Sequence, residues 1–495
     1  MNEHQRSSRR SLLKRAGGII AAAAFPTGGR LAAQPAGPVI TELSKYMSEA
    51  GSRALPEEAL ERTKEHILDT FAAMVSGVDL PPARLAMQFA RAHGGEKTAT
   101  VVCSNLLCGA IEAALANGML AHSDETDDSH ALSHSHPGCA VVPAALAAGE
   151  QFGIDGARFV RAVALGYDIG PRVTMTLGGL PYQMETHRAS HSIAGNFGAA
   201  AAAGCAASLN PQQMRWLLDY ASQQASGIVA WQRDTDHIEK SLVFAGMPAR
   251  NGVTAALLVQ LGGTGVDDVF SGADNFLMAF AAKGNPEKLI EKLGQRYEVT
   301  QTNIKKWTVG SPIQAPLDAL VNIRKRRPFE AEQVDKVTVR VATSEAKTVN
   351  NREIPDICMQ HMIAVMLIDK TASFAAAHDK PRMKDAAVLR ERAKVQLVPD
   401  EELERQYPKR ESIVEVTLKD GTHLTERVDA VRGTVDNPMT RDEVVAKCRD
   451  LMTPLLGGEK CSKLIERVLD LEHVGKIQEL RPLLQRERGG LNAGF

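Results

Sequence analysis

The sequence predicts a mainly helical protein in which a large all-helical domain is followed by a smaller α+β domain. Ala and Gly are abundant, whereas aromatic residues make up only 4% of the chain, and this composition favours closely packed helices over a β-sandwich. Apolar residues recur with helical spacing from about residue 39 to residue 289, and period-two alternation starts only after about residue 306. The 495 residues also exceed the length of one ordinary domain.

The first 33 residues are predicted to be an export signal that does not belong to the fold. Residues 8–14, SRRSLLK, resemble a twin-arginine signal, and the apolar stretch at residues 16–25 is too short for a stable membrane anchor. Small residues at 31–33 offer a cleavage site. An Arg-rich disordered tail is the alternative. With the signal, the mature chain is expected in the periplasm and free of the membrane.

Residues 39–295 are predicted to form the helical domain. The helix at residues 55–77 has Pro56 at its first helical position, two glutamates in its first turn and Gly77 at its end. The run AGNFGAAAAAG, residues 194–204, has small residues on every face, which indicates close helix packing. A phosphate-binding loop would require a preceding strand, and no strand is predicted before this run. Further helices are predicted at residues 108–122, 140–152, 157–168 and 192–208.

Residues 296–445 are predicted to form the α+β domain, and residues 446–495 C-terminal helices that pack back on the helical domain. Residues 335–343 and 393–399 alternate with period two, and residues 412–428 read as a hairpin around Asp420-Gly421. A buried helix is predicted at residues 359–374. Thr440 and Glu443 have the spacing of a capping box that starts the C-terminal helices.

Charge and cysteine content restrict the classes of partner. The formal net charge is −1, with acidic and basic residues mixed along the chain, so the sequence lacks the basic face of a nucleic-acid-binding protein. The expected partner is a small molecule or a second copy of the chain. The seven cysteines form no C-x-x-C pair, which predicts buried free thiols and argues against a disulfide framework.

Residues 121–138, AHSDETDDSHALSHSHPG, place four histidines beside four carboxylates between two predicted helices. A solvated polar loop is one interpretation, although the apolar flanks should bring the segment near a core, where such groups need mutual partners. A metal site is the second, with His130 and His134 four residues apart and Asp127 as a third ligand. The segment lacks an H-E-x-x-H motif, and we predict no metal.

Acid/base chemistry is the third interpretation of this segment. A histidine beside carboxylates can titrate near neutral pH and remove a proton from carbon next to a carboxylate. Such chemistry also needs cations that hold the substrate's carboxylate and the charge that develops. Candidates for this role elsewhere in the chain are Arg172, Lys240 and Arg250.

Six segments follow one another in a recognisable order along the chain. They are ILDTFAAMVSG (67–77), residues 113–150, GYDIGPRV (166–173), HSIAGNFGAAAAAG (191–204), residues 239–265 and KKWTVGSPIQAPLDAL (305–320). This order resembles the MmgE/PrpD family, whose members include 2-methylcitrate dehydratase, cis-aconitate decarboxylase and iminodisuccinate epimerase. The resemblance extends from about residue 39 to the C-terminus. It implies a helical domain with a smaller α+β domain, a homodimer, an active site between the domains, and hydro-lyase chemistry without a metal or organic cofactor.

The resemblance also carries site residues over to this sequence. His136, in the motif HPG, matches a family histidine and is implied to be the leading acid/base, with His191 as a second one. Glu125 and Asp127 would orient or polarise His136. Substrate-binding roles are implied for Ser129, Asp128, Lys240, Arg250 and Gln314.

Gln314 stands where decarboxylase-like members carry a histidine, and its amide can orient a substrate but cannot transfer a proton. We therefore interpret the chain as an exported lyase or isomerase that abstracts a proton next to a carboxylate. Hydration or dehydration of a small di- or tricarboxylate is the first expectation, and an epimerase/isomerase or a decarboxylase is the alternative. A noncatalytic periplasmic carboxylate-binding protein and a metal-binding protein are alternatives of another class.

Overall fold

The computed structural model describes residues 35–281 and 283–486, so the predicted export signal at residues 1–33 lies outside the described residues. The described residues from Ala36 onward belong to one compact unit. They build two main hydrophobic cores, one from residues 40–304 together with residues 439–484, and the other from residues 309–431. A large helical part and a smaller α+β part are therefore present, and the predicted fold class is confirmed.

The larger core is built around α8 (Ser190–Ala206), which contacts α5, α6 and α11. A Cβ atom at Gly170 on α6 would lie 2.4 Å from the carbonyl oxygen of Ala194, so these helices approach closely only because glycine lacks a side chain. The close packing predicted for residues 194–204 is thus confirmed. The other elements of this part are α1 (Pro38–Glu49), α2 (Glu57–Ser76), α3 (Pro81–His93), β1 (Ala99–Thr100), β2 (Leu107–Cys108), α4 (Ala110–Ala121), α5 (Gly138–Phe152), α6 (Gly156–Leu177), α7 (Gly179–Thr186), α9 (Pro211–Gln223), α10 (Ile238–Ser241), α11 (Met247–Gln260) and α12 (Phe276–Phe280).

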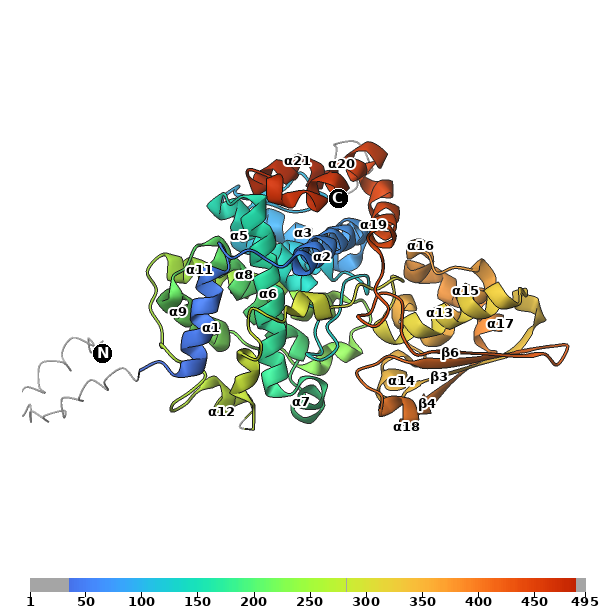
Figure 1. Ribbon diagram of the computed structural model, residues 1–495. Helices are drawn as coiled ribbons and strands as arrows, with labels where there is room; N and C mark the ends of the chain where they lie inside the picture. Colours follow the sequence, from blue (N-terminus) through green and yellow to red (C-terminus); the bar gives the residue numbers. More distant parts are fainter. Residues whose placement is uncertain (1–34, 282, 487–495) are drawn as a thin grey trace, which may run out of the picture. The chain divides into compact units, whose positions relative to one another are not determined.

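The smaller core packs one four-stranded sheet against α13 and α15 (Figure 1). The strand order is β4-β3-β5-β6, with β3 parallel to β4 and the other two pairs antiparallel. The predicted hairpin is confirmed, and Gly421 supplies the positive φ, 85°, that its turn requires. The elements are α13 (Ser311–Arg326), β3 (Val334–Ala342), α14 (Thr343–Val349), α15 (Met359–Asp369), α16 (Phe374–His378), α17 (Ala386–Arg392), β4 (Val395–Asp400), α18 (Glu401–Glu404), β5 (Ser412–Leu418) and β6 (His423–Val428).

Two helix ends differ from the sequence prediction. Helix α6 continues past residue 168 to Leu177, since Pro171 removes only one backbone donor and the segment is almost entirely buried. The helix predicted at residues 359–374 stops at Asp369, because Lys370 adopts a left-handed conformation with φ of 64°. Helix α16 then starts separately, with the Ser373 hydroxyl as its N-cap.

The C-terminal helices belong to the larger core although they follow the sheet in the sequence. Helices α19 (Arg441–Leu456) and α20 (Gly458–Leu469) lie beside α2 (Figure 1), and α21 (Arg481–Leu484) contacts α20. The predicted capping box of Thr440 and Glu443 is present. Lys447 donates a 2.6 Å hydrogen bond to Asp69 across the contact with α2. The chain therefore enters the α+β part and returns from it.

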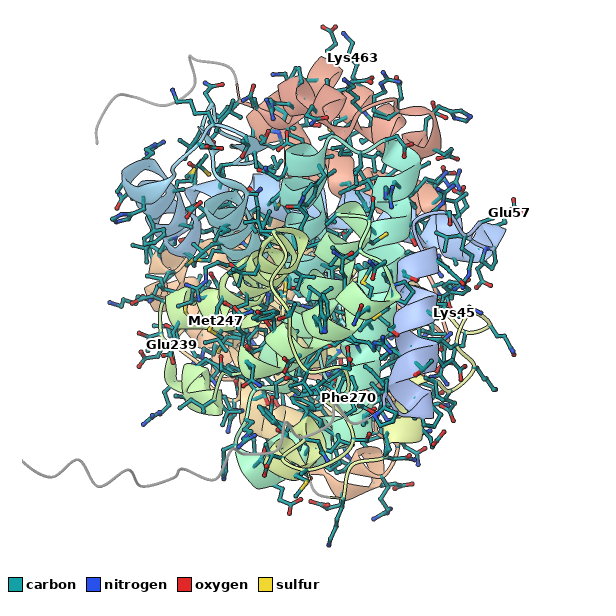
Figure 2. All side chains as sticks on the ribbon, turned by 90° about the vertical axis from the view of Figure 1, so that its left-hand side faces the viewer. Lys45, Glu57, Glu239, Met247, Phe270 and Lys463 are labelled. Atoms are coloured by element: carbon teal, nitrogen blue, oxygen red, sulfur yellow. The ribbon has the colours of Figure 1, made fainter. Side chains whose placement is uncertain are left out.

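Charged side chains of the helical part, such as Lys45, Glu57 and Lys463, point outward (Figure 2). The helical run Ile238–Gln260 could cross a membrane by length and composition alone, but 61% of its most apolar window is buried inside the protein. Its apolar composition is therefore explained by packing in the core.

Candidate active site

The histidine-rich segment connects α4 to α5 and runs through the interior of the protein. Every residue from 122 to 130 is buried, and the exposed fractions of His122 and Asp127 are 0%. The interpretation as a solvated polar loop is therefore wrong. Because a buried charge is costly without a partner, the contacts of this segment decide what it can do.

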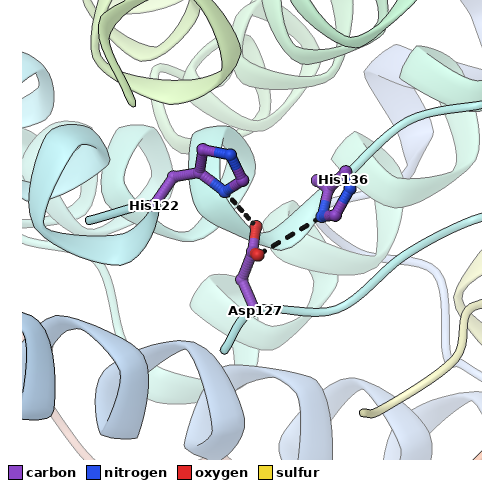
Figure 3. Close-up of side chains that lie close together, drawn as sticks. All are labelled: His122, Asp127 and His136. Carbon is purple, nitrogen blue, oxygen red and sulfur yellow. Dashed lines mark hydrogen bonds and ion pairs between the residues drawn. The ribbon is translucent and has the colours of Figure 1, made fainter. Parts of the chain in front are cut away.

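Asp127 lies between two histidines (Figure 3). Its Oδ2 atom is 3.0 Å from Nδ1 of His122, and its Oδ1 atom is 3.3 Å from Nδ1 of His136 and 3.6 Å from Nζ of Lys305. Burial by itself raises the pKa of Asp127, but the two histidines and Lys305 together hold that pKa well below its usual range. A proton on Nδ1 of His136 would face the ionised Asp127, and that tautomer leaves Nε2 as the basic nitrogen.

Glu125 is the second buried carboxylate of the segment. It forms an ion pair with Lys240, its Oε2 atom lies 3.6 Å from Nζ of Lys305, and Nε2 of His237 is 4.0 Å away. Burial raises the pKa of Glu125, yet the two lysines outweigh that effect and keep the pKa well below its usual value. Glu125 is thus a fixed negative charge that holds both ammonium groups beside His136.

Three imidazoles form a wall next to Phe244. The ring of His191 stacks on that of Phe244 with centroids 4.0 Å apart, and it lies 5.2 Å from His136 and 4.6 Å from His134. Burial lowers the pKa of His134 to about 3 and also lowers the pKa values of His136 and His191. These imidazoles are therefore neutral at neutral pH, the state in which a histidine accepts a proton.

A cavity of about 240 Å³ lies between the helical part and the α+β part. The α+β part contributes Ser311 at the start of α13, Glu345 on α14, and Tyr407 and Arg410 from the segment between β4 and β5. Asp127 lies directly behind this surface, in contact with His136. Four of the residues predicted from the sequence line the cavity together: Glu125, His136, His191 and Lys240.

Asp128 and Ser129 are adjacent to these residues but do not line the cavity. Asp128 accepts hydrogen bonds from the hydroxyl of Tyr167 (2.5 Å) and the backbone N–H of Gly138 (3.0 Å), and it contacts Nδ1 of His66 at 2.8 Å. Ser129 pairs through its backbone with Asn303 in both directions. Both residues hold the segment in place, and their substrate-binding roles stay predictions.

Arg250 and Gln314 are also absent from the cavity lining. Arg250 is exposed on α11 and donates to the side chain of Asn251. The amide of Gln314 donates to the carbonyl oxygens of Trp307 (2.7 Å) and Val309 (2.8 Å) and accepts from the N–H of Trp307. Gln314 thus fixes the backbone that leads to the cavity residue Gly310. The substrate-binding roles of Arg250 and Gln314 stay predictions.

Several residues at the site were not singled out from the sequence. Lys305 donates a 2.9 Å hydrogen bond to the carbonyl oxygen of Glu125, and His237 lines the cavity beside Lys240. Lys305 begins the KKW segment that contributed to the family resemblance, so a signal for it was available. Tyr407 and Arg410 carry no local signal, because they reach the site only through the packing of the α+β part.

Two sets of side chains have donor atoms close enough to hold a metal ion. They are His122, Asp127 and His136, and His122, Glu125 and His237; within each set the atoms lie within 4.8 Å of one another. Their donor types suit zinc. However, Lys305 lies 3.6 Å from both carboxylates, and Lys240 pairs with Glu125. A cation would have to compete with two ammonium groups, so the arrangement favours proton transfer.

A separate ion pair joins this segment to the α+β part. Nε2 of His378 on α16 lies 2.8 Å from Oδ2 of Asp124. Burial tends to lower the pKa of His378, but Asp124 raises it, to about 9, against about 6.5 in an unfolded chain. The stabilisation is therefore fully present below pH ~6.5 and is lost as the pH rises through about 9.

At pH ~6.5 we expect His378→Gln to have a free energy of unfolding about 3 kcal/mol lower than that of the native protein. The difference should disappear toward pH ~9.5, because the native protein itself loses this stabilisation over that range. Urea unfolding at a series of pH values would measure it as a native-minus-variant difference that shrinks with rising pH. His473, exposed at its own ion pair with Asp470, provides the control His473→Gln. An equal difference at all pH values would contradict this account.

Comparisons with known proteins agree with this arrangement of two parts. Residues 41–289 match the MmgE/PrpD N-terminal domain, and residues 307–471 match the MmgE/PrpD C-terminal domain. A cis-aconitate decarboxylase-like protein of Aspergillus oryzae is 25% identical over 488 residues, which cover 92% of this chain and 98% of the relative. A cis-aconitate decarboxylase of Aspergillus terreus is 24% identical over 478 residues (90% and 96%), and the human cis-aconitate decarboxylase is 23% identical over 456 residues (87% and 91%).

Proposed function

Because the chain belongs to the MmgE/PrpD family, we propose that it is a lyase that moves a proton at the carbon beside a carboxylate. One observation carries the proposal: His136, a neutral imidazole in the cavity, is oriented by the ionised Asp127 and lies in a site with Lys240. Such a step requires a base, a group that orients the base, and a cation that holds the substrate's carboxylate.

In an elimination, Nε2 of His136 takes the α-proton and the electron pair of the C–H bond forms the new C=C bond. The hydroxyl group on the next carbon leaves with its bonding electrons and is protonated to water. The proton for the leaving hydroxyl comes from His136, which has just taken one up; His191, 5.2 Å from His136 between ring centroids, is the neighbouring imidazole. Lys240, which lines the cavity, stabilises the negative charge that develops on the substrate carboxylate, and Lys305 holds Glu125 and Asp127 behind it.

The specific reaction is a choice among related chemistries. Hydration or dehydration of a small carboxylate follows from the sequence expectation, and decarboxylation is the second candidate because the relatives reported above are named as cis-aconitate decarboxylases or as decarboxylase-like. In a decarboxylation, the C–C bond breaks, CO₂ leaves and the carbanion takes a proton from a protonated His136. An epimerase would use the same base. Export and a homodimer remain predictions.

A noncatalytic carboxylate-binding protein was an alternative because Gln314 replaces a family histidine. In the structure, the amide of Gln314 is occupied by backbone groups of residues 307–309. The base, its orienting carboxylate and the lysines are arranged without it. This arrangement supports the lyase over the binding-protein alternative.

Proton NMR in deuterated water tests the proposed function. The protein would be incubated with hydroxy acids and unsaturated acids carrying one, two or three carboxylates. We expect deuterium at the α-carbon of at least one acid, together with the product of elimination, hydration or decarboxylation. A complete lack of exchange and turnover across the panel would overturn the proposal.

A further inference from the structure

We infer that the cavity takes an acid with a single carboxylate and an apolar remainder, in contrast to the di- or tricarboxylate expected from the sequence. The inference rests on the proposed function, because it concerns the substrate of the same site. Two independent features carry it. The charges around the cavity almost cancel, and a large part of the lining is apolar.

The charges nearest to His136 cancel. Lys240 forms an ion pair with Glu125, and Nζ of Lys305 lies 3.6 Å from a carboxylate oxygen of Glu125 and of Asp127. Two ammonium groups therefore face two carboxylates. The imidazoles beside them add no positive charge at neutral pH, because burial lowers their pKa values.

The outer lining leaves one positive charge. Arg410 forms a salt bridge with Glu345, with 2.7 Å between Nη1 and Oε1. Lys347 and Arg352 are the other cations of the lining, and Asp234 is its remaining carboxylate. The guanidinium of Arg352 donates to two backbone carbonyl oxygens, one from each part of the chain. In total, the described lining side chains carry four positive and three negative charges.

A ligand with one carboxylate neutralises this excess. A trianion such as cis-aconitate would leave two negative charges without a counter-charge in a partly closed cavity. Charges that lose water without gaining a partner are costly, and like charges brought together at a binding site lower affinity strongly. The charge distribution therefore favours a monoanion.

Apolar side chains from both parts of the chain share the lining. Trp231 and Phe244 are buried, with exposed fractions of 9% and 1%, whereas Met184 on α7 is 56% exposed and lies toward solvent. An apolar surface of this kind stabilises bound hydrocarbon by about 25 cal/mol per Å² removed from water, and it offers nothing to a second or third carboxylate. The apolar side chains that face a ligand include Leu180, Met184, Trp231, Phe244, Ile354 and Ile357.

Calorimetric titration at neutral pH with three non-reacting probes tests the inference. Hexanoate and adipate have six carbons each and differ in carrying one or two carboxylates, and tricarballylate carries three. We expect hexanoate to bind at least about tenfold more tightly than adipate, and tricarballylate to bind most weakly. Equal or tighter binding of adipate or tricarballylate, or no measurable binding of any probe, would overturn the inference.

A matched pair of variants tests the charge argument directly. Met184→Lys adds a cation at the cavity, and we expect it to raise the affinity for adipate relative to hexanoate about tenfold. Met278→Lys adds the same charge at a methionine on α12 that is 61% exposed and is not part of the lining, and the ratio should stay unchanged. Arg352→Gln should weaken hexanoate binding about tenfold, and an unchanged Kd would contradict the assignment of the excess charge.

The titrations test the inferred ligand class, and the proton-exchange experiment tests the proposed lyase activity, so each claim can be wrong while the other stands. If no acid exchanges a proton but hexanoate is preferred, the proposed lyase activity is wrong and the inferred ligand class stands. If a tricarboxylate is turned over and bound best, the lyase activity stands and the inferred ligand class is wrong.

Discussion

Replacing His136 by glutamine is expected to lower kcat about 10²- to 10⁴-fold while the melting temperature changes by no more than about 2 °C. Glutamine keeps a side-chain donor toward Asp127, so the buried carboxylate retains a partner, but it cannot take up a proton. The measurement is the initial rate on the best acid of the NMR panel, together with scanning calorimetry on the same preparations.

The control for this variant is His423→Gln, at an exposed histidine on β6, which should leave both quantities unchanged. Asp127→Asn should also lower kcat, through loss of the carboxylate that orients His136. If His136→Gln retains full activity, His136 is not the base. His191, its neighbour in the wall of imidazoles, would then be the next residue to test.

Replacing Arg172 by methionine is expected to lower the free energy of unfolding by about 3–5 kcal/mol, because the variant leaves a buried carboxylate without its cation. Arg172 was one of the cations considered for substrate binding, but its side chain is fully buried. It donates to Asp168 (3.0 Å) and to the carbonyl oxygens of Glu291 (2.7 Å) and Arg296 (2.9 Å). It therefore ties α6 to the segment that follows α12.

Guanidinium unfolding of the variant measures this effect, and Arg250→Met provides the matched control. Arg250 is exposed and contacts only Asn251 among the described side chains, so its loss should change stability by no more than about 0.5 kcal/mol. Unchanged stability of Arg172→Met together with a raised KM would instead support the substrate-binding role considered from the sequence.

The candidate site could be predicted where its residues lie close together in the sequence. Glu125, Asp127 and His136 occupy one short segment between two helices, so acid/base work was one of three interpretations of the segment, and the family resemblance selected these residues. The same segment shows the limit of such reasoning. Asp127 and Asp128 are neighbours of equal chemistry, yet the first orients His136 and the second is enclosed by Tyr167 and other donors of the helical core.

Lys240 and Arg250 were both predicted from the sequence to bind substrate, but they lie on different faces of their helical run. Lys240 and Arg250 lie ten residues apart on one continuous helical run, but a π turn at Leu242–Gly246 shifts the phase between them. Lys240 faces the cavity and Arg250 faces solvent. A π turn has no clear signature in composition or periodicity, so this outcome was not available from the sequence.

By itself, the sequence determined the helical domain, the sheet hairpin and the family, and it singled out the histidine segment as the proposed source of the base, because periodicity, turn residues and motif order are local properties of a chain. The tertiary structure decided which charges meet. Tyr407 and Arg410 reach the cavity, and Lys305 reaches Asp127 behind it, from positions about 170 to 285 residues beyond the histidine segment. Their approach depends on how two separate cores pack, and long-range packing leaves no periodic trace in the residues that it brings together.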